Sequence, residues 1–518
     1  MAVYLPGLIP AILVAAGLLS FLWRHRMSRF GAYVPQIAAL AAFVVSGMVA
    51  ARLAIGSAHT LTIFSIDRTA IALRVDVISV VMVLLVSFIG WVVTRYAAVY
   101  LDGEKRQGAF NGWLLLTLGA VAALVLAGDL VTLIAAWIAT SLFLHRLLLF
   151  YPQRANARRA ARKKFLTARL SDAVLIGAAV LLVAAFGTTD IAEVLAAART
   201  EPEGHLPVAA ACLLAIAAAV KSAQFPTHGW LTEVMETPTP VSALLHAGVI
   251  NAGGFLLVRF ADVLVLSNAA LAGLVIVGGL TALFGSIVML TQSAVKTSLA
   301  WSTVAQMGFM ILECGLGLFP LALLHILAHS LYKAHSFLAS GGAVERIAAA
   351  RRLGPVAVPS PAAVWRAFFA ALAIYVIVGA VLGFAEKPPQ TIALGAILIF
   401  GVAYLFAQGF ADAAPRALTK RTAAYAVATS LGYFILQSLA TWFTAGVLPP
   451  PPAPGMAEWL LIGLAVCSFA AVALLQGMLP LWANHPAVAG LRVHISNGLY
   501  LNALFDRLIG GWNVRKHG

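Results

Sequence analysis

The stretch AVKSAQFPTHGW, residues 219–230, ends a run of Ala, Leu, Ile and Val with a lysine and places a proline five residues later. A proline removes a backbone donor and breaks a helix, and a charge at the centre of a spanning helix costs about 2.5–3.5 kcal/mol. Broken helices at membrane depth occur where they line a cavity or a polar path. The stretch therefore predicts a membrane helix that breaks at Pro226, with Lys221 on such a path. Snorkelling of Lys221 to the membrane interface is the alternative.

The composition extends this interpretation to the whole chain. Of its 518 residues, 62% are hydrophobic and only 10% are charged, whereas a soluble domain is about 25% charged. The net charge of +15 comes from Lys and Arg that gather in short loops between apolar segments, which is the pattern that sets membrane orientation. We therefore expect membrane lipid, and no nucleic acid, around this chain. The first apolar stretch, 2–23, has no basic region before it and no cleavage site after it, so we expect a retained helix.

Apolar stretches long enough to span a membrane recur along the chain. A spanning helix needs about 20 apolar residues, and this length predicts an all-α polytopic membrane protein with about 14–15 transmembrane helices. A short segment at 228–236 is a candidate half-helix after the break. The candidate spans are 2–23, 30–53, 73–97, 110–127, 129–151, 166–186, 206–223, 240–260, 265–289, 297–316, 319–343, 364–385, 390–413, 422–445 and 457–480.

Alternate loops between these spans are basic. They are RHRMSR at 24–29, RANARRAARKK at 154–164, ERIAAARRL at 345–353 and PRALTKR at 415–421. With an odd number of spans, all four loops fall on one side, and the positive-inside rule makes that side cytoplasmic. We therefore expect the N-terminus outside and the C-terminus in the cytoplasm.

Several ionisable residues lie within the candidate spans. In the stretch LLHILAHSLYKAHSFLASGG, residues 323–342, the spacing i, i+4, i+8 stacks two histidines and a lysine on one helix face. Imidazoles titrate near neutrality, and a lysine removed from water also titrates closer to it, so such a ladder favours an ion relay. A metal pair and purely structural hydrogen bonding are the alternatives; the metal pair lacks a nearby glutamate and an obvious third ligand. The candidate relay residues are Asp172, Lys221, His246, Lys296, His325, His329 and Lys333.

Signatures of catalysis are missing from the sequence. It contains no Gly-rich nucleotide loop, no paired CxxC and no Gly-x-Ser-x-Gly elbow. The cysteines, Cys212, Cys314 and Cys467, lie far apart in apolar segments, so we expect them to be packing residues. The chain is therefore expected to be neither an enzyme nor a metal-binding protein by itself.

Three motifs carry a resemblance to a known family: KSAQFPTHGWLTEVMETPTPVSALLHAGVINAGG at 221–254, VKTSLAWSTVAQMGFM at 295–310, and the ladder at 323–342. The sequence there resembles the proton-translocating antiporter-type subunits of respiratory complex I and of Mrp cation/proton antiporters. The resemblance implies two inverted five-helix repeats, each with a broken helix, and a chain of charged residues near the membrane midplane. By motif match, Lys221 resembles the broken-helix lysine and His246 the histidine that follows it. Asp172 matches the acidic residue of the sixth span, and Lys296, His325, His329 and Lys333 resemble the relay toward the second half.

The sequence departs from this family in two places. Ile138, in AAWIATSLFLHRLLL, stands where the family has a glutamate that pairs with the broken-helix lysine, which leaves Asp172 as an alternative partner for Lys221. The span at 390–413 offers only Gln408 and Asp412 where the family has a lysine or glutamate. After the span at 457–480 only a short tail follows, so we also expect this chain to be without the long lateral helix of complex I subunits. In these features it is similar to the membrane subunit of the DAB-type inorganic carbon transporters.

That similarity implies a two-component system in the bacterial inner membrane. H+ or Na+ flowing through this chain would drive a large zinc-containing, carbonic-anhydrase-like partner subunit to hydrate CO2 to bicarbonate in the cytoplasm, with no cofactor in this chain. An antiporter-type subunit of complex I, an Mrp antiporter or a membrane hydrogenase is the alternative, and a non-conducting anchor is a third. We expect N-terminal helices at 1–105, antiporter-like halves at 106–260 and 261–445, and a last helix with a cytoplasmic tail at 446–518.

Overall fold

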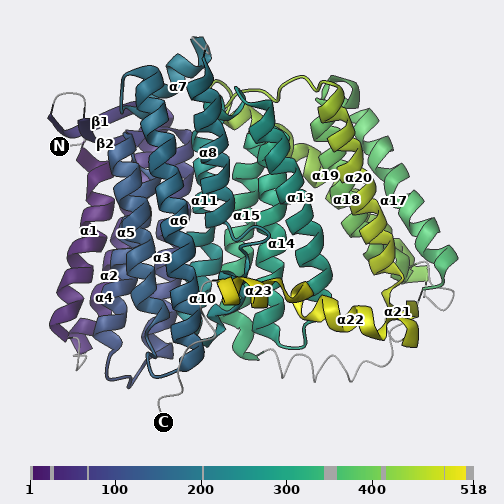
Figure 1. The fold of residues 1–518 in the computed structure, drawn as a ribbon, viewed down its shortest axis with the longest axis horizontal. Helices are drawn as coiled ribbons and strands as arrows, with labels where there is room; N and C mark the ends of the chain where they lie inside the picture. The colour runs from purple at the N-terminus through teal and green to yellow at the C-terminus, as the bar shows by residue number, and fades with distance from the viewer. Residues whose placement is uncertain are drawn as a thin grey trace. The chain divides into compact units, whose positions relative to one another are not determined.

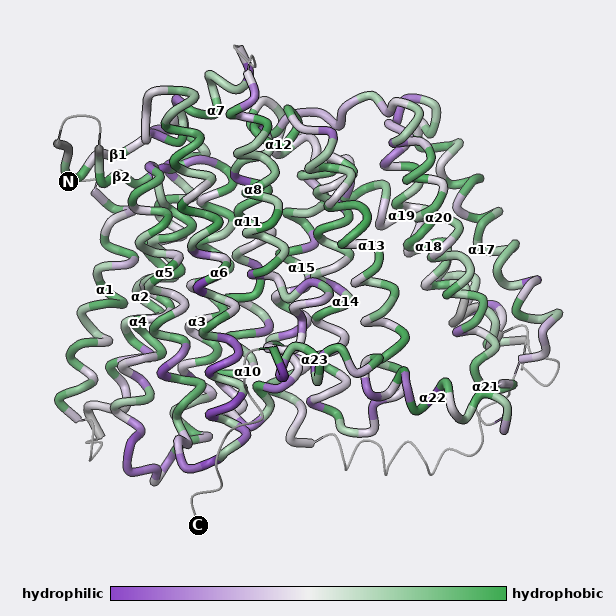
Figure 2. The backbone as a smooth tube through the Cα atoms, in the orientation of Figure 1, coloured by the Kyte–Doolittle hydropathy of each residue, from purple (hydrophilic) through white to green (hydrophobic). Residues whose placement is uncertain are grey.

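The computed structural model describes residues 4–23, 29–66, 69–200, 204–342, 359–409, 416–482 and 485–508. These residues are mostly helical, and eleven of the described helices are long and apolar enough to cross a membrane. In Figure 2, hydrophobic residues follow most of the length of these helices. The prediction of an all-α polytopic membrane protein is confirmed. The count of fourteen or fifteen spans stays a prediction, as do the inverted repeats.

The described chain divides into two compact units, and each is discontinuous in sequence. The first unit takes the described parts of 1–270, 325–340 and 501–518, and the second takes those of 271–324 and 341–500. Most of the ladder helix at 319–338 thus belongs to the first unit, although the chain reaches it only after two helices of the second. The domain boundaries at 260 and 445 stay a prediction.

The first unit is built from long helices joined by short connections (Figure 1). Among them α6 packs along α8, and α4 packs against both α1 and α5. Its elements are α1 (Leu5–Ser20), α2 (Arg29–Ile55), β1 (His59–Ile66), β2 (Thr69–Val75), α3 (Val77–Tyr100), α4 (Gln107–Val125), α5 (Leu130–Leu148), α6 (Ala155–Phe186), α7 (Ile191–Thr200), α8 (His205–Lys221), α9 (Gly229–Thr232), α10 (Thr239–Ala247), α11 (Ala252–Arg259), α12 (Ala261–Leu264), most of α15 (Phe319–Leu338) and α23 (Leu501–Leu508).

The second unit is also helical. A core of Phe368, Tyr375, Phe400 and Phe434 joins three of its helices, and α20 packs against the same core. The Tyr375 hydroxyl donates to the Ile392 carbonyl oxygen at 2.8 Å. The helices are α13 (Asn268–Leu290), α14 (Val295–Gly315), α17 (Pro361–Val381), α18 (Pro389–Gly409), α19 (Arg416–Phe443), α20 (Met456–Gly477), α21 (Leu479–Trp482) and α22 (Ala489–Ser496).

Every predicted span contains a helix, but some boundaries were wrong. The span predicted at 166–186 begins at Ala155, so the basic run at 154–164 is the first third of a helix and not a loop. The start of the span predicted at 73–97 is a strand of an antiparallel hairpin that pairs His59 with Val75. The basic run at 415–421, also predicted as a loop, lies almost wholly in α19, which begins at Arg416. The basic loop at 345–353 and most of the one at 24–29 lie outside the described residues.

A buried ion pair joins α3 to the end of α11. Asp76 caps α3 by accepting from the Ser79 backbone N–H at 2.8 Å, and it binds Arg259 at 2.5 Å and Arg74 at 2.6 Å. Burial by itself would raise the pKa of the Asp76 carboxyl, but Arg259, the Ser79 N–H and Arg74 together hold that pKa well below its usual range. The carboxylate is therefore ionised at neutral pH. Its ion pair with Arg259 holds the end of α11 against the start of α3.

The helix α23 docks on the first unit through a second buried cluster. Lys163 of α6 is fully buried and donates to Asp506 at 2.6 Å and to Glu233 at 2.8 Å. Asn502 accepts from the same lysine at 2.7 Å. A Cβ at Gly229 would lie 1.7 Å from the Asn502 side-chain oxygen, so only glycine allows α23 to approach α9 this closely.

Candidate functional site

The chain breaks its helical path immediately after Lys221. Helix α8 ends at that lysine, and the chain continues through turns past Pro226 to the short helix α9. A second interruption separates α10 from α11 at 248–251, directly after His246. Both breaks are largely buried, so their polar groups face other parts of the unit.

Lys221 lies against an aromatic ring. Its Nζ is 4.3 Å from the centroid of the Trp137 ring on α5, and its side chain is buried. Within the part of the chain that the structure describes, this Nζ has no hydrogen-bond partner. Ile138, where the family has its glutamate, directly follows Trp137, so α5 offers the ammonium a π face in place of a carboxylate.

Asp172 lies on α6 and pairs with Arg169 at 2.6 Å, one turn earlier in the same helix. The charge of Asp172 also acts on Lys221, but the direct ion pair in this structure is the one with Arg169. Asp172 is therefore placed near Lys221 without replacing the missing glutamate as its hydrogen-bonded partner.

A lysine that sequence reasoning missed lies in the same place. Lys164 of α6 donates to the Ser141 carbonyl oxygen at 2.7 Å and to the Ser141 Oγ at 2.8 Å. A small cavity is lined by Lys164, Lys221, Ser141, Thr167 and Trp230, among others. The basic composition of 154–164 predicted a loop and so gave no reason to consider Lys164 buried. The signal that could have found it is a helical period of buried residues, which extends from the apolar part of α6 back into this run. Its members are Ala157, Ala160, Ala161, Lys164, Thr167 and Ala168.

The histidine ladder of α15 lies within the first unit. His329 and Lys333 are buried, and the ring centroids of His325 and His329 are 6.0 Å apart. His246 stacks on Phe337 of α15 with ring centroids 4.3 Å apart, and its charge interacts with Lys333. The structure therefore brings the candidate relay residues of α10 and α15 together.

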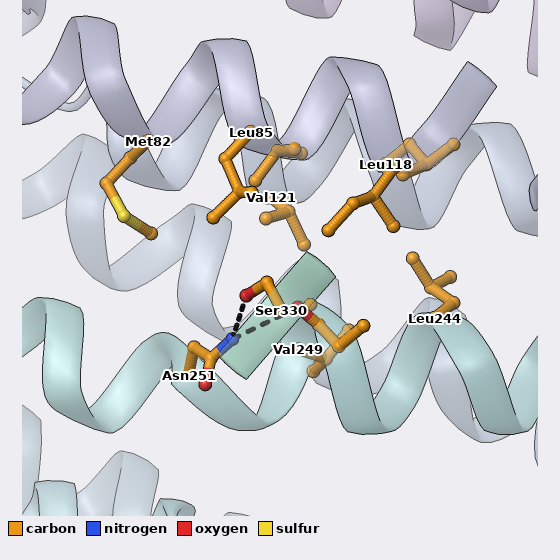
Figure 3. Close-up of a pocket in the computed structure, with 12 residues that line it drawn as sticks. Met82, Leu85, Leu118, Val121, Leu244, Val249, Asn251 and Ser330 are labelled. Carbon is orange, nitrogen blue, oxygen red and sulfur yellow. Dashed lines mark hydrogen bonds between the residues drawn. The ribbon is translucent and has the colours of Figure 1, made fainter. Parts of the chain in front are cut away.

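An apolar pocket lies beside the interruption between α10 and α11. Figure 3 shows Met82, Leu85, Leu118 and Val121 lining it, with Asn251 directed at Ser330 of α15. The Asn251 side-chain amide donates to the Ser330 Oγ at 2.7 Å and to the Ala247 carbonyl oxygen at 3.0 Å. These bonds hold the interruption against α15 one turn from His246.

The remaining candidates lie in the second unit. Lys296 is in the first turn of α14 and is half-buried. Asp412 and the Gln408 side chain lie outside the described residues. Among the residues that the structure describes, no group of three or more His, Cys, Asp or Glu could hold a metal ion.

Buried lysines and histidines beside helix breaks, inside a multi-pass apolar bundle, define an antiporter-like membrane subunit. The family described as NADH:quinone oxidoreductase/Mrp antiporter, TM, matches residues 127–387. The complex I chain 5 N-terminus family matches residues 64–111. The chain therefore belongs to the NADH:quinone oxidoreductase/Mrp antiporter family, among its inorganic carbon transporter subunits.

Curated relatives support both the family and the group of inorganic carbon transporter subunits within it. The chain is 38% identical to the probable inorganic carbon transporter subunit DabB2 of Halothiobacillus neapolitanus, over 85% of this chain and 80% of that protein. It is 48% identical to the probable inorganic carbon transporter subunit DabB of Hydrogenovibrio crunogenus, over 56% of each chain. It is 36% identical to NADH-quinone oxidoreductase subunit L of Mycobacterium tuberculosis, over 52% of this chain and 43% of that protein.

Solved structures support the fold. The structure of the Mrp complex from Dietzia sp. matches 98% of this chain and 59% of its own chain, with a TM-score of 0.67 and 23% identity. The archaeal membrane-bound sulfane sulfur reductase complex matches 96% of this chain with a TM-score of 0.59 and 15% identity. At these identities the likeness concerns the fold alone.

Proposed function

We propose that this chain is the ion-conducting membrane subunit of an energy-coupled inorganic carbon accumulator in the bacterial inner membrane. Its partner is a large zinc-containing, carbonic-anhydrase-like subunit that hydrates CO2 to bicarbonate. The observation that carries the proposal is the buried Lys221, which lines a cavity at a helix break. The relatives named as inorganic carbon transporter subunits support the choice of cargo. An antiporter-type subunit of a respiratory complex is the alternative.

The relay begins at Lys221 and continues through the α10 break to α15. A protonated Lys221 is stabilised by the Trp137 ring, and a neutral one needs no counter-charge, so the site is suited to both states. Val249, beside the α10–α11 interruption, lines both the Lys221 cavity and the pocket of Figure 3. His246, Lys333 and His329 follow along α10 and α15. We assign Lys296 to the continuation of this path in the second half.

The chemistry of these groups favours H+ as the coupling ion. Hard metal cations take oxygen ligands, especially carboxylates and carbonyls. The candidate path instead consists of amines and imidazoles, which bind and release protons. In this proposal the N-terminus lies outside, the C-terminus lies in the cytoplasm, and the partner subunit uses the energy of proton entry to hydrate CO2 in one direction.

The test is rescue of a carbonic-anhydrase-deficient bacterium in ambient air. The gene is expressed alone, with the neighbouring gene for the large partner, and with that partner plus Lys221→Ala. We expect growth only with both wild-type proteins, because the driving force passes through Lys221. An absence of rescue, with both proteins present in the membrane fraction, would contradict the carbon accumulator and support the respiratory alternative.

A further inference from the structure

Two buried lysines contact successive turns of the same helix. Lys221 lies on the Trp137 ring, and Lys164 donates to Ser141 one turn further along α5. Both side chains line one cavity, and the charges of the two lysines act on each other. Each lysine comes from a different helix, α8 and α6, so the cavity holds two amines from separate elements.

The surrounding charges do not neutralise both amines. On α6, Asp172 is engaged by Arg169 at 2.6 Å, and the neighbouring Lys163 is turned to Glu233 and Asp506. On α5, the charge of His145 also interacts with Lys164. Two ammonium ions in a low-dielectric cavity repel each other strongly. The cavity therefore favours the state in which only one of the two lysines is protonated.

Ser141 can form hydrogen bonds with Lys164 in both protonation states of the lysine. The ammonium form donates to the Ser141 carbonyl oxygen and to Oγ. After loss of a proton, the amine still donates to the carbonyl oxygen, and the hydroxyl can rotate and donate its own hydrogen to the nitrogen lone pair. Lys163 differs, because two carboxylates and the Asn502 amide oxygen hold it, and all three accept from its charged form.

We propose that Lys164 is the proton-exchange partner of Lys221. The ammonium of Lys164 releases a proton to water in the shared cavity and becomes a neutral amine, while the neutral amine of Lys221 takes a proton from that water. The water is regenerated and the total charge is unchanged. The inference rests on the proposed function, and it gives Lys221 a second lysine as its partner, where the resemblance implies pairing with the glutamate absent at Ile138.

The variants separate proton exchange from a structural cross-link between α5 and α6. Lys164→Gln can still donate to Ser141 but cannot carry a proton, and Lys164→Arg keeps the charge but does not release it. Lys164→His restores a titratable nitrogen. Arg162→Met, at an exposed position of the same helix, is the matched control. The measurement is the initial rate of labelled bicarbonate accumulation by cells expressing both subunits, divided by the amount of this chain in the membrane.

We expect Lys164→Gln and Lys164→Arg each to lower the rate by about tenfold or more. We expect Lys164→His to recover a measurable part of it and Arg162→Met to leave it unchanged. A rate above half of the wild-type value in either Lys164→Gln or Lys164→Arg would overturn the inference, because a cross-link or a fixed charge would then be sufficient.

Lys221→Ala in the same cells distinguishes this inference from the proposed function. If Lys221→Ala is inactive and Lys164→Gln is active, only the role of Lys164 is wrong. If Lys221→Ala accumulates bicarbonate at the wild-type rate, the relay itself is wrong and the role of Lys164 falls with it.

Discussion

Trp137 holds its ring against Lys221 from α5, a helix that has no carboxylate to bind the ammonium. A cation over the face of a tryptophan gains about 0.5–2 kcal/mol, which is less than a buried carboxylate provides. The ring thus attracts the charged form without making its release costly. The proposed relay needs this property at Lys221, and under that proposal proton transfer does not require a glutamate at position 138.

Trp137→Leu is expected to lower bicarbonate accumulation several-fold, because the leucine side chain offers no π face to the ammonium. Trp137→Phe, which keeps a weaker ring, should retain an intermediate rate. The rates are measured in cells expressing both subunits, as for Lys164. Equal rates for wild type, Trp137→Phe and Trp137→Leu would show that the ring only fills space.

Asp76→Asn is expected to destabilise the protein by about 3–5 kcal/mol, because Arg259 is then left buried without its counter-charge. The melting temperature in detergent should fall, and Asp102→Asn, at an exposed position, should leave it unchanged. The Asp76 pKa is lowered in the folded state. Its stabilisation is therefore complete above the ordinary carboxyl pKa of about 4 and declines as the pH falls below it. The stability of Asp76→Asn should lack this part of the acid dependence.

Among the helices, α15 carries titratable residues on both a buried and an exposed face. Lys333 and His329 are buried, whereas His335 of the same helix is exposed. Lys333→Ala should abolish coupled activity while the protein still inserts, because it removes the lysine that His246 faces. His335→Gln should keep the wild-type rate of bicarbonate accumulation. Full activity of Lys333→Ala would exclude this helix from the relay.

The elements also show what could be predicted from the sequence. Apolar length was sufficient to find every long helix among the described residues, and the spacing of His325, His329 and Lys333 was sufficient to place them on one face. The start of α6 was missed because a basic composition was taken to mean a loop, although Lys163 and Lys164 both find buried partners. The hairpin β1–β2 was not predicted, because the apolar residues at the end of β2 continue directly into the apolar helix α3 and are counted with it.

For the molecule as a whole, contacts between distant parts of the chain could not be predicted from the sequence. Nothing in the local sequence connects Lys163 with Asp506, or Gly229 with Asn502, because such pairs are defined only by the folded arrangement. Lys164 likewise becomes a candidate only when its cavity is seen to include Lys221. The roles of the candidate site residues stay predictions.

Asp506→Asn is expected to destabilise the first unit by about 3–5 kcal/mol, because the fully buried Lys163 then loses its buried carboxylate partner. Arg507→Gln, at the adjacent exposed position, should have no effect. Melting of the detergent-solubilised protein, followed by fluorescence-detected size exclusion, measures both variants. Equal melting temperatures for Asp506→Asn and wild type would show that the docking of α23 adds no stability.

The docking of α23 on α6 has a consequence for how the protein is made. Lys163 is translated long before Asp506, so α6 is made when one of the two carboxylate partners of Lys163 does not yet exist. Until then α6 carries a buried cation that lacks one of its counter-charges. We therefore expect a chain that is cut before α23 to keep a partly uncompensated cation on α6.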